Sequence, residues 1–232
     1  MKRQLISVIG VEIVDIDLFY HFVNYYDPYI DEFSLVFNYK NKETLDSFYE
    51  MVPKNKRNIQ FWDKKFIDEA KTIYINSLID LEGRTSLIAD HDEFIEFNEG
   101  FFDCPRNKCN VGKLVQRFNV VNEKLVLSKV ERDKSLFDQF KYLSITDMPG
   151  GYINTFRASA KVCYVHSNMR VSNGHHCLEG CKGPTAEQVH ATTNVHHFKY
   201  DSYFPKVVKN ILDIYPTSNE LMTLDKLIER KT

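Results

Sequence analysis

Three carboxylates stand at the end of an apolar run in the segment TSLIADHDEFIEF, residues 85–97. Residues 87–89 are typical of a buried strand, and Asp90, Asp92 and Glu93 follow them within four positions. Carboxylates that converge at a turn offer the hard oxygen ligands that Mg²⁺ and Mn²⁺ prefer, and such ions are usually shared with substrate phosphates. The segment therefore indicates a divalent ion and a phosphorylated substrate. An acidic surface turn is the alternative that the spacing leaves open.

Histidines gather late in the chain. Five of the eight histidines fall within residues 175–197, and imidazole is a common metal ligand. His196 and His197 belong to the segment NVHHF, which also fits a strand whose histidines only form hydrogen bonds. His175 and His176 belong to a glycine-flanked loop, which we place on the acceptor or diphosphate side.

Alternating strands and helices precede the acidic segment. β-branched apolar runs predict the strands, and apolar residues at helical spacing predict the helices. The predicted strands are 5–14, 33–39, 58–62 and 85–89, and the predicted helices are 16–27, 41–52 and 63–81. Asn41 and Asp63 are placed to cap the second and third helices. This alternation predicts an α/β fold with a mainly parallel sheet, which binds ligands at the carboxyl ends of its strands, where the acids stand.

The second half of the chain is less regular. The predicted elements are strands at 113–121, 124–130 and 154–167, and helices at 132–143, 200–215 and 217–231. No repeat, linker or low-complexity segment divides the sequence. We therefore expect a single domain over residues 1–232.

The composition is that of an ordinary globular chain, with 232 residues, 43% hydrophobic and 27% charged, and a formal net charge of -2. The weak net charge, without a basic run, argues against a nucleic-acid or anionic membrane surface as partner. Glu12, Asp15 and Asp17 interrupt the N-terminal apolar run, so it does not fit a signal peptide. No apolar stretch reaches the roughly 20 residues of a transmembrane helix. We expect a cytoplasmic protein.

The five cysteines offer a second metal chemistry. Cys104 and Cys109 are spaced C-x4-C, and Cys177 and Cys181 are spaced C-x3-C beside two histidines. A tetrahedral structural zinc is therefore an alternative. Buried free thiols are the other interpretation, and an odd number of cysteines suits a reducing compartment.

Four segments together resemble small glycosyltransferases of the GT-A fold, in the family-2-like group. They are HFVNYYDPYIDEFSLVFN (21–38), NIQFWDKKF (58–66), LIADHDEFIEF (87–97) and NVHHFKYDS (194–202). The D-x-D-E-F and late H-H-F elements follow the order typical of that group. The resemblance implies one GT-A-like, Rossmann-like α/β domain with a mixed, mainly parallel sheet flanked by helices. Residues 1–97 would bind the nucleotide sugar, and residues 98–232 would face the acceptor.

The resemblance also implies a reaction and its metal site. A sugar would move from a nucleoside diphosphate sugar, UDP being the commonest in the family, to a hydroxyl of a glycan, protein or lipid-linked acceptor. Asp92 would be the main ligand of Mn²⁺ or Mg²⁺, and Asp90 would lie near the donor ribose and the metal. His197 would be a further metal ligand, with His196 next. The ion would stabilise the charge that grows on the departing diphosphate.

Other polar residues are candidates for contacts with substrate. The candidate substrate-binding residues are Asp63, Asp90, Glu93, Lys65, His176 and His196. An inverting transfer needs a base near the acceptor hydroxyl, and Glu179 and Asp147 are the candidates. The sugar, the acceptor and the stereochemistry stay open at this point.

Two other classes of protein use the same kind of site. A metal-dependent phosphohydrolase or nucleotidyltransferase shares the carboxylate, metal and phosphate chemistry. A non-catalytic binding domain, with or without a structural zinc, would show no metal-dependent affinity for nucleotides.

Overall fold

The computed structural model describes residues 1–64, 67–121, 124–144, 160–172, 178–179, 187–198 and 201–202. The strands are β1 (Lys2–Gly10), β2 (Glu32–Asn38), β3 (Arg57–Trp62), β4 (Arg84–Ile88), β5 (Glu93–Ile95), β6 (Cys109–Val121), β7 (Lys124–Val126), β8 (Tyr142–Ser144), β9 (Ala160–His166) and β10 (Val189–His197). The helices are α1 (Ile16–Tyr26), α2 (Lys42–Met51), α3 (Asp68–Ile79) and α4 (Leu136–Gln139), with short 3-10 turns at Asp27–Tyr29 and Lys54–Lys56.

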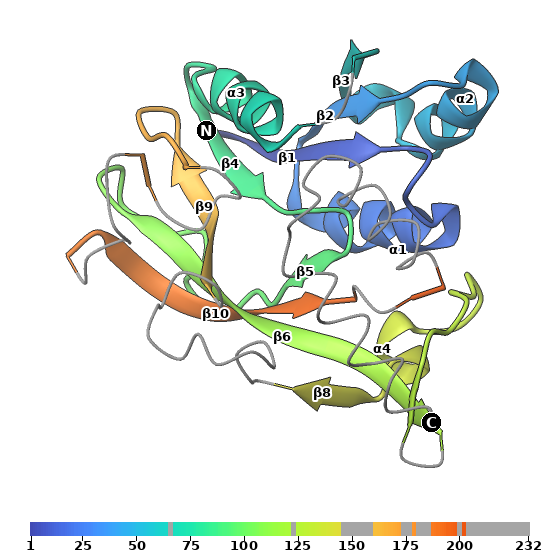
Figure 1. The fold of residues 1–232 in the computed structure, drawn as a ribbon. Helices are drawn as coiled ribbons and strands as arrows, with labels where there is room; N and C mark the ends of the chain where they lie inside the picture. The colour runs from blue at the N-terminus through green and yellow to red at the C-terminus, as the bar shows by residue number, and fades with distance from the viewer. Residues whose placement is uncertain are drawn as a thin grey trace.

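One mixed sheet runs through both halves of the chain (Figure 1). Its order is β3-β2-β1-β4-β9-β6-β10-β5, and β7 and β8 also pair with β6. The pairs β1–β2, β2–β3 and β1–β4 are parallel, as the alternation of strands and helices predicts. Strand β9 is antiparallel to both β4 and β6, so it joins the parallel half to the rest. The predicted α/β class is confirmed.

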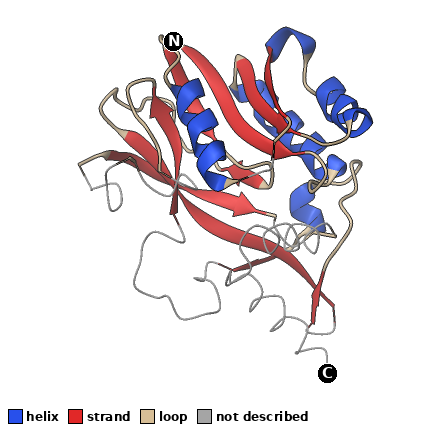
Figure 2. Cartoon of the chain, turned by 45° about the horizontal axis from the view of Figure 1, so that its top comes forward, coloured by secondary structure: helices blue, strands red, loops and turns tan. Residues whose placement is uncertain are grey.

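Helices cover both faces of the sheet (Figure 2). Phe19 and Phe22 of α1 and Phe48 of α2 are buried in one core cluster. Ile75 and Leu78 of α3 are buried in a second cluster on the other face. No helix in the described part of the chain has the length and apolar character needed to cross a membrane.

The N-terminus of α2 follows the predicted capping pattern. The side chain of Asn41 accepts hydrogen bonds from the backbone N–H groups of Glu43 and Thr44. An Asn side chain at this position satisfies N–H groups that have no partner within the helix. Local chemistry therefore fixes where α2 begins.

The prediction that Asp63 caps the third helix is wrong. Helix α3 begins five residues later, and its N-cap residue, Ile67, makes no side-chain cap. The side-chain amide of Asn38 donates to the carbonyl groups of Trp62 and Lys64, at 3.0 and 2.7 Å. These carbonyl groups accept hydrogen bonds from a side chain of β2, so they do not begin the hydrogen-bond ladder of a helix.

The helix predicted at 132–143 is reduced to the four residues of α4. The side chain of Gln139 accepts from the backbone N–H of Glu131 and donates to its carbonyl, each at 2.7 Å. It also donates to the carbonyl of Lys134 at 2.9 Å. The backbone before α4 therefore bonds to a side chain rather than to a helical ladder. Most of the helix predicted at 200–215 (residues 200 and 203–215), the helix predicted at 217–231, and residues 154–159 of the predicted strand lie outside the described residues.

A polar network closes the sheet at the amino ends of its parallel strands. Glu32, which is buried, forms ion pairs with Lys2 and Arg84 and accepts from Asn58 at 3.0 Å. Burial opposes its charge, but the hydrogen bonds from Lys2, Asn58 and Arg84 outweigh burial and hold the pKa of Glu32 below its ordinary value. This network lies at the edge of the sheet opposite the acidic segment.

Candidate active site

The acidic segment lies at the switch point of the sheet. From β1 the chain passes to β2 on one side, whereas β4 pairs with β1 on the other side. The carboxyl ends of β1 and β4 are therefore at the position in the strand order where open α/β sheets bind ligands. Residues 89–93, called here the acidic loop, leave β4 at this point and enter β5.

Strand β5 fixes the far end of the acidic loop. Glu93 pairs with His197 in the antiparallel β5–β10 register. The other edge of β5 is closed by α1, because the Tyr26 hydroxyl donates to the carbonyl of Glu93 at 2.9 Å and accepts from the N–H of Ile95 at 3.0 Å. Tyr26 and Phe94 are buried in the core. The loop is thus held at both ends.

Asp92 and His197 meet, as the resemblance implies. Asp92 Oδ2 lies 3.0 Å from His197 Nε2, and the amide nitrogen of Gln116 lies 3.0 Å from His197 Nδ1. The register of β5, β10 and β6 aligns Glu93, His197 and Gln116 across three strands. Burial opposes the charge of Asp92, but the imidazoles of His197 and His91 outweigh it and hold the pKa of Asp92 well below its usual value. Asp92 is therefore an ionised carboxylate.

The separation of this pair fits two neighbouring ligands of one divalent ion. Ligand atoms about 2.1 Å from an ion and at right angles to each other lie about 3 Å apart. The buried Gln116 Oε1 has no hydrogen-bond partner in the structure. Turned toward Nδ1, it would accept the ring proton and leave the Nε2 lone pair to an ion. Among the described residues, no group of three or more His, Cys, Asp or Glu side chains is arranged to hold a metal, so substrate oxygens and water would complete its shell.

Asp90 is held by two lysines instead. Its Oδ1 lies 2.5 Å from Lys71 Nζ, and its Oδ2 lies 2.8 Å from Lys161 Nζ. Lys161 also lies 2.5 Å from Glu93 Oε1, and Glu93 Oε2 accepts the backbone N–H of Asp90 at 3.1 Å. We call these four residues the lysine–acid cluster. Both oxygens of Asp90 face ammonium groups, so this geometry does not present them to an ion that Asp92 and His197 would hold.

The register of β4 and β9 explains the place of Lys161. Leu87 pairs with Tyr164 in this antiparallel pair, and Asp90 stands three residues after Leu87 while Lys161 stands three residues before Tyr164. Lys161 is buried, which disfavours its charge, but Asp90 and Glu93 outweigh burial and raise its pKa. Both lysines were missed at the sequence level. A lone lysine inside the apolar run ASAKVCYVH is the signal that points to a buried counter-charge.

His196 belongs to a different environment. Adjacent residues of a strand point to opposite faces, so His196 does not share the contacts of His197. Arg117 Nε donates to its Nδ1 at 3.2 Å, and its ring lies 5.1 Å from that of Phe137. Burial, together with the charge of Arg117, lowers the pKa of His196. The structure does not bring it to Asp92.

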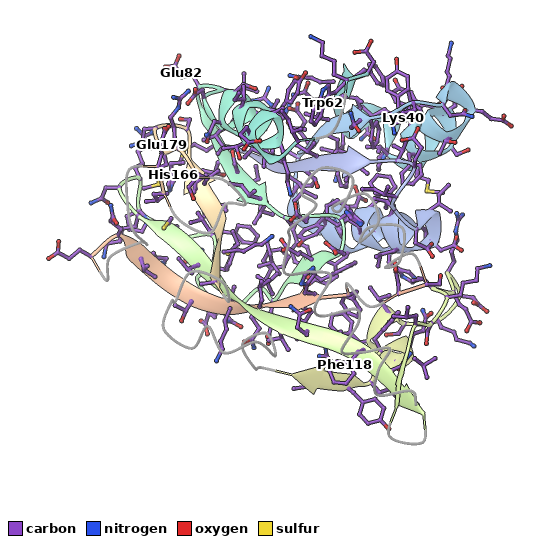
Figure 3. All side chains as sticks on the ribbon, in the orientation of Figure 1. Lys40, Trp62, Glu82, Phe118, His166 and Glu179 are labelled. Atoms are coloured by element: carbon purple, nitrogen blue, oxygen red, sulfur yellow. The ribbon has the colours of Figure 1, made fainter. Side chains whose placement is uncertain are left out.

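The remaining predicted residues are not brought to the acidic loop. Asp63 is exposed after β3, three strands from β4 and therefore about 14 Å away across the sheet. Glu179 forms an ion pair with Arg170, which also pairs with Asp80 just after α3. Figure 3 shows Glu179 on the side of the molecule away from Lys40, which follows the carboxyl end of β2. Because α3 leads into the amino end of β4, Glu179 lies at the edge of the sheet opposite Asp92. Asp147, Lys65 and His176 lie outside the described residues.

The described cysteines are not arranged as a zinc site. Cys104, Cys109 and Cys163 are free and buried. Burial raises the pKa of the Cys104 thiol to about 12, and no group of three or more His, Cys, Asp or Glu side chains among the described residues could hold a metal. Its sulfur lies 3.3 Å from the carbonyl oxygen of Lys108. Cys177, Cys181 and the two neighbouring histidines lie outside the described residues.

Comparisons with known proteins find similarity in structure and not in sequence. No protein-family model and no curated protein matches the chain. HddC from Yersinia pseudotuberculosis aligns at 11% identity and a TM-score of 0.43, over 89% of this chain and 97% of that one. TarS 1-349 from S. aureus, in complex with UDP-GlcNAc, aligns at 13% identity and 0.42, over 91% and 67%. A putative glucose-1-phosphate thymidylyltransferase from Bacillus anthracis aligns at 14% identity and 0.34, over 55% and 63%. At these values the functional argument rests on the chain's own residues.

Proposed function

We propose that this chain is a metal-dependent glycosyltransferase that moves a sugar from a nucleoside diphosphate sugar, with UDP as the first candidate nucleotide, to an acceptor hydroxyl. One observation carries the proposal. Asp92 and His197 are 105 positions apart in sequence, yet their side chains lie 3.0 Å apart at the switch point. The order of the D-x-D-E-F and H-H-F segments, which resembles that of GT-A glycosyltransferases, supports the same assignment.

Asp92 and His197 have different roles in the proposed metal site. Asp92 supplies an ionised carboxylate, and His197 supplies an imidazole nitrogen whose orientation Gln116 fixes from the other side of the ring. A bound Mn²⁺ or Mg²⁺ would act as a Lewis acid toward the diphosphate leaving group. Strand β5 and the Tyr26 hydroxyl keep the acidic loop in place, so the pair needs little reorganisation to bind an ion.

Binding of nucleotides tests the metal site. We would titrate the protein with UDP, GDP and CMP by calorimetry, each with and without Mn²⁺. The proposal predicts that one nucleoside diphosphate binds tightly only with the metal. Asp92→Asn should weaken that binding at least tenfold, whereas Asp46→Asn, an exposed carboxylate on α2, should not. Absence of metal-dependent binding for every nucleotide would contradict the proposal.

The products distinguish sugar transfer from the two related metal-dependent reactions. Phosphorus NMR of the protein with a UDP-sugar and a panel of acceptors should show UDP, and mass spectrometry should show an acceptor that has gained the sugar. Cleavage of the diphosphate by water, which gives UMP and a sugar 1-phosphate, would indicate a phosphohydrolase. Pyrophosphate formed from UTP and a sugar 1-phosphate would indicate a nucleotidyltransferase.

A further inference from the structure

The four side chains of the lysine–acid cluster differ in their exposure to solvent. The side chains of Glu93 and Lys161 are 1% and 9% exposed, whereas those of Lys71 and Asp90 are 12% and 19% exposed. Lys161 contacts both carboxylates at once. Lys161 is thus the ammonium group between the two acids, and Lys71 contacts Asp90 from the more exposed side of the cluster.

The helix does not explain a lysine at position 71. Lys71 stands in the first turn of α3, since its N–H donates to the carbonyl of Ile67, the N-cap residue. A positive charge is disfavoured at this end of a helix, where the dipole is positive. Asp90 already has a buried cation in Lys161. The place of Lys71 therefore calls for a role beyond the stability of α3.

The balance of charges at the site indicates what that role is. Asp90, Asp92 and Glu93 bring three negative charges to a loop that, on the proposed function, must accept an anionic diphosphate. Lys71 and Lys161 neutralise two of them. A divalent ion at Asp92 then makes the site net positive, whereas without the lysines it stays net negative.

We propose that Lys71 binds the diphosphate of the donor, and that Asp90 holds its ammonium group beside the metal pair until the donor arrives. The inference rests on the proposed function. An ammonium group carries three donors, and the contact with Asp90 Oδ1 uses one of them. Lys161 is a positioning residue, because it is buried between two carboxylates and acts by holding Asp90.

The test compares a nucleotide with its own nucleoside. UDP and uridine, or GDP and guanosine where the wild type prefers GDP, are titrated with Mn²⁺ into wild type, Lys71→Met and Lys71→Arg. Loss of a charged hydrogen bond predicts that Lys71→Met weakens nucleotide binding about 10- to 100-fold and leaves nucleoside binding within about twofold. Lys71→Arg should keep most of the nucleotide affinity. The matched control is Lys2→Met, which removes a lysine from Glu32 at the opposite edge of the sheet.

Each outcome has a defined meaning. Equal loss of nucleotide and nucleoside binding would make Lys71 a structural residue and overturn the inference, and unchanged binding in Lys71→Met would do the same. If the wild type binds no nucleoside diphosphate with metal, both the proposed function and the inference fail. If the wild type binds and Lys71→Met binds equally well, only the inference fails.

A measurement on the wild type covers the case in which Lys71→Met does not fold. The protein is reductively methylated with formaldehyde, and the modified lysines are quantified by peptide mass spectrometry. Saturating nucleotide with Mn²⁺ should reduce methylation of Lys71, whereas the nucleoside should not. Equal methylation of Lys71 with nucleotide and with nucleoside would overturn the inference.

Discussion

Lys161→Met removes the ammonium group on which two carboxylates of the acidic loop depend. Lys161 Nζ lies 2.8 Å from Asp90 Oδ2 and 2.5 Å from Glu93 Oε1, and the Glu93 side chain is only 1% exposed. Removing one partner of a buried ion pair leaves the other charge uncompensated and costs about 3–5 kcal/mol. Since domains of ordinary stability have about 5–15 kcal/mol in total, the loss is a large share.

Urea unfolding followed by circular dichroism measures this loss. With a denaturant slope of about 3 kcal/mol/M, the expected loss moves the unfolding midpoint by roughly 1–2 M. The exposed Lys113→Met on β6 is the matched control and should move the midpoint by less than about 0.3 M. The double variant Lys161→Met with Glu93→Gln should recover part of the loss, because the buried Glu93 charge that Lys161 balanced is gone, whereas Asp90 keeps its contact with Lys71.

The loss should also depend on pH, with a defined sign. In the wild type the folded pKa of Lys161 is raised, so its stabilisation is fully present below the unfolded value of 10.5 and does not vary between pH 5 and 8. In the variant the folded state gains a proton on the buried carboxylate that has lost Lys161 as pH falls, so the deficit should be smaller at pH 5 than at pH 8. A deficit below about 1 kcal/mol at pH 8, or one equal at both pH values, would refute the ion-pair reasoning.

Three further substitutions test other parts of the account. Glu32→Gln should cost about 1–3 kcal/mol in urea unfolding and leave nucleotide binding unchanged. Because the folded pKa of Glu32 is lowered, the gap from wild type should be full above its ordinary value of 4.5 and close as pH falls through the folded value. Tyr26→Phe removes the hydroxyl that closes the edge of β5, so it should cost about 1–3 kcal/mol and speed hydrogen exchange at the Ile95 amide. Gly112→Ala places a Cβ 2.1 Å from Val195 Cγ2 between β6 and β10, and the overpacking should lower thermal stability by about 1–3 kcal/mol.

The first half of the fold was predictable because its signals are local. The periodicity of apolar residues and the cap at Asn41 give β1–β4 and two of the three helices to within a few residues. The start of α3 was not predictable, since it depends on Asn38, a residue of another strand, binding the carbonyls of Trp62 and Lys64. A contact between distant segments leaves no trace in a local pattern.

The second half depends on such distant contacts. Strand β9 enters between β4 and β6, where it pairs Thr85 with His166 and Gly112 with Lys161. No local signal chooses these partners. The shortening of α4 by Gln139 is a further example, because the amide competes with the helical ladder for the same backbone groups.

The site was predictable in part. Asp92 and His197 were identified by the segments that contain them, and the structure brings these two side chains together. Lys71 was missed because a lysine in an amphipathic helix looks the same in sequence whether it faces solvent or a buried acid. Lys161 was detectable, since a lysine in an apolar strand needs a buried counter-charge, but its partner Asp90 depends on the antiparallel register.

The central claim is that Asp92 and His197 hold one divalent ion together with a nucleoside diphosphate. Pulsed electron paramagnetic resonance of Mn²⁺ with the protein and UDP tests it most directly, because an imidazole ligand couples its nitrogen nucleus to the manganese spin. The account predicts a directly coordinated nitrogen in the wild type and in His196→Gln, and none in His197→Gln. A nitrogen signal that survives in His197→Gln, or its absence from a wild-type complex that contains bound Mn²⁺, would contradict the assignment of the site.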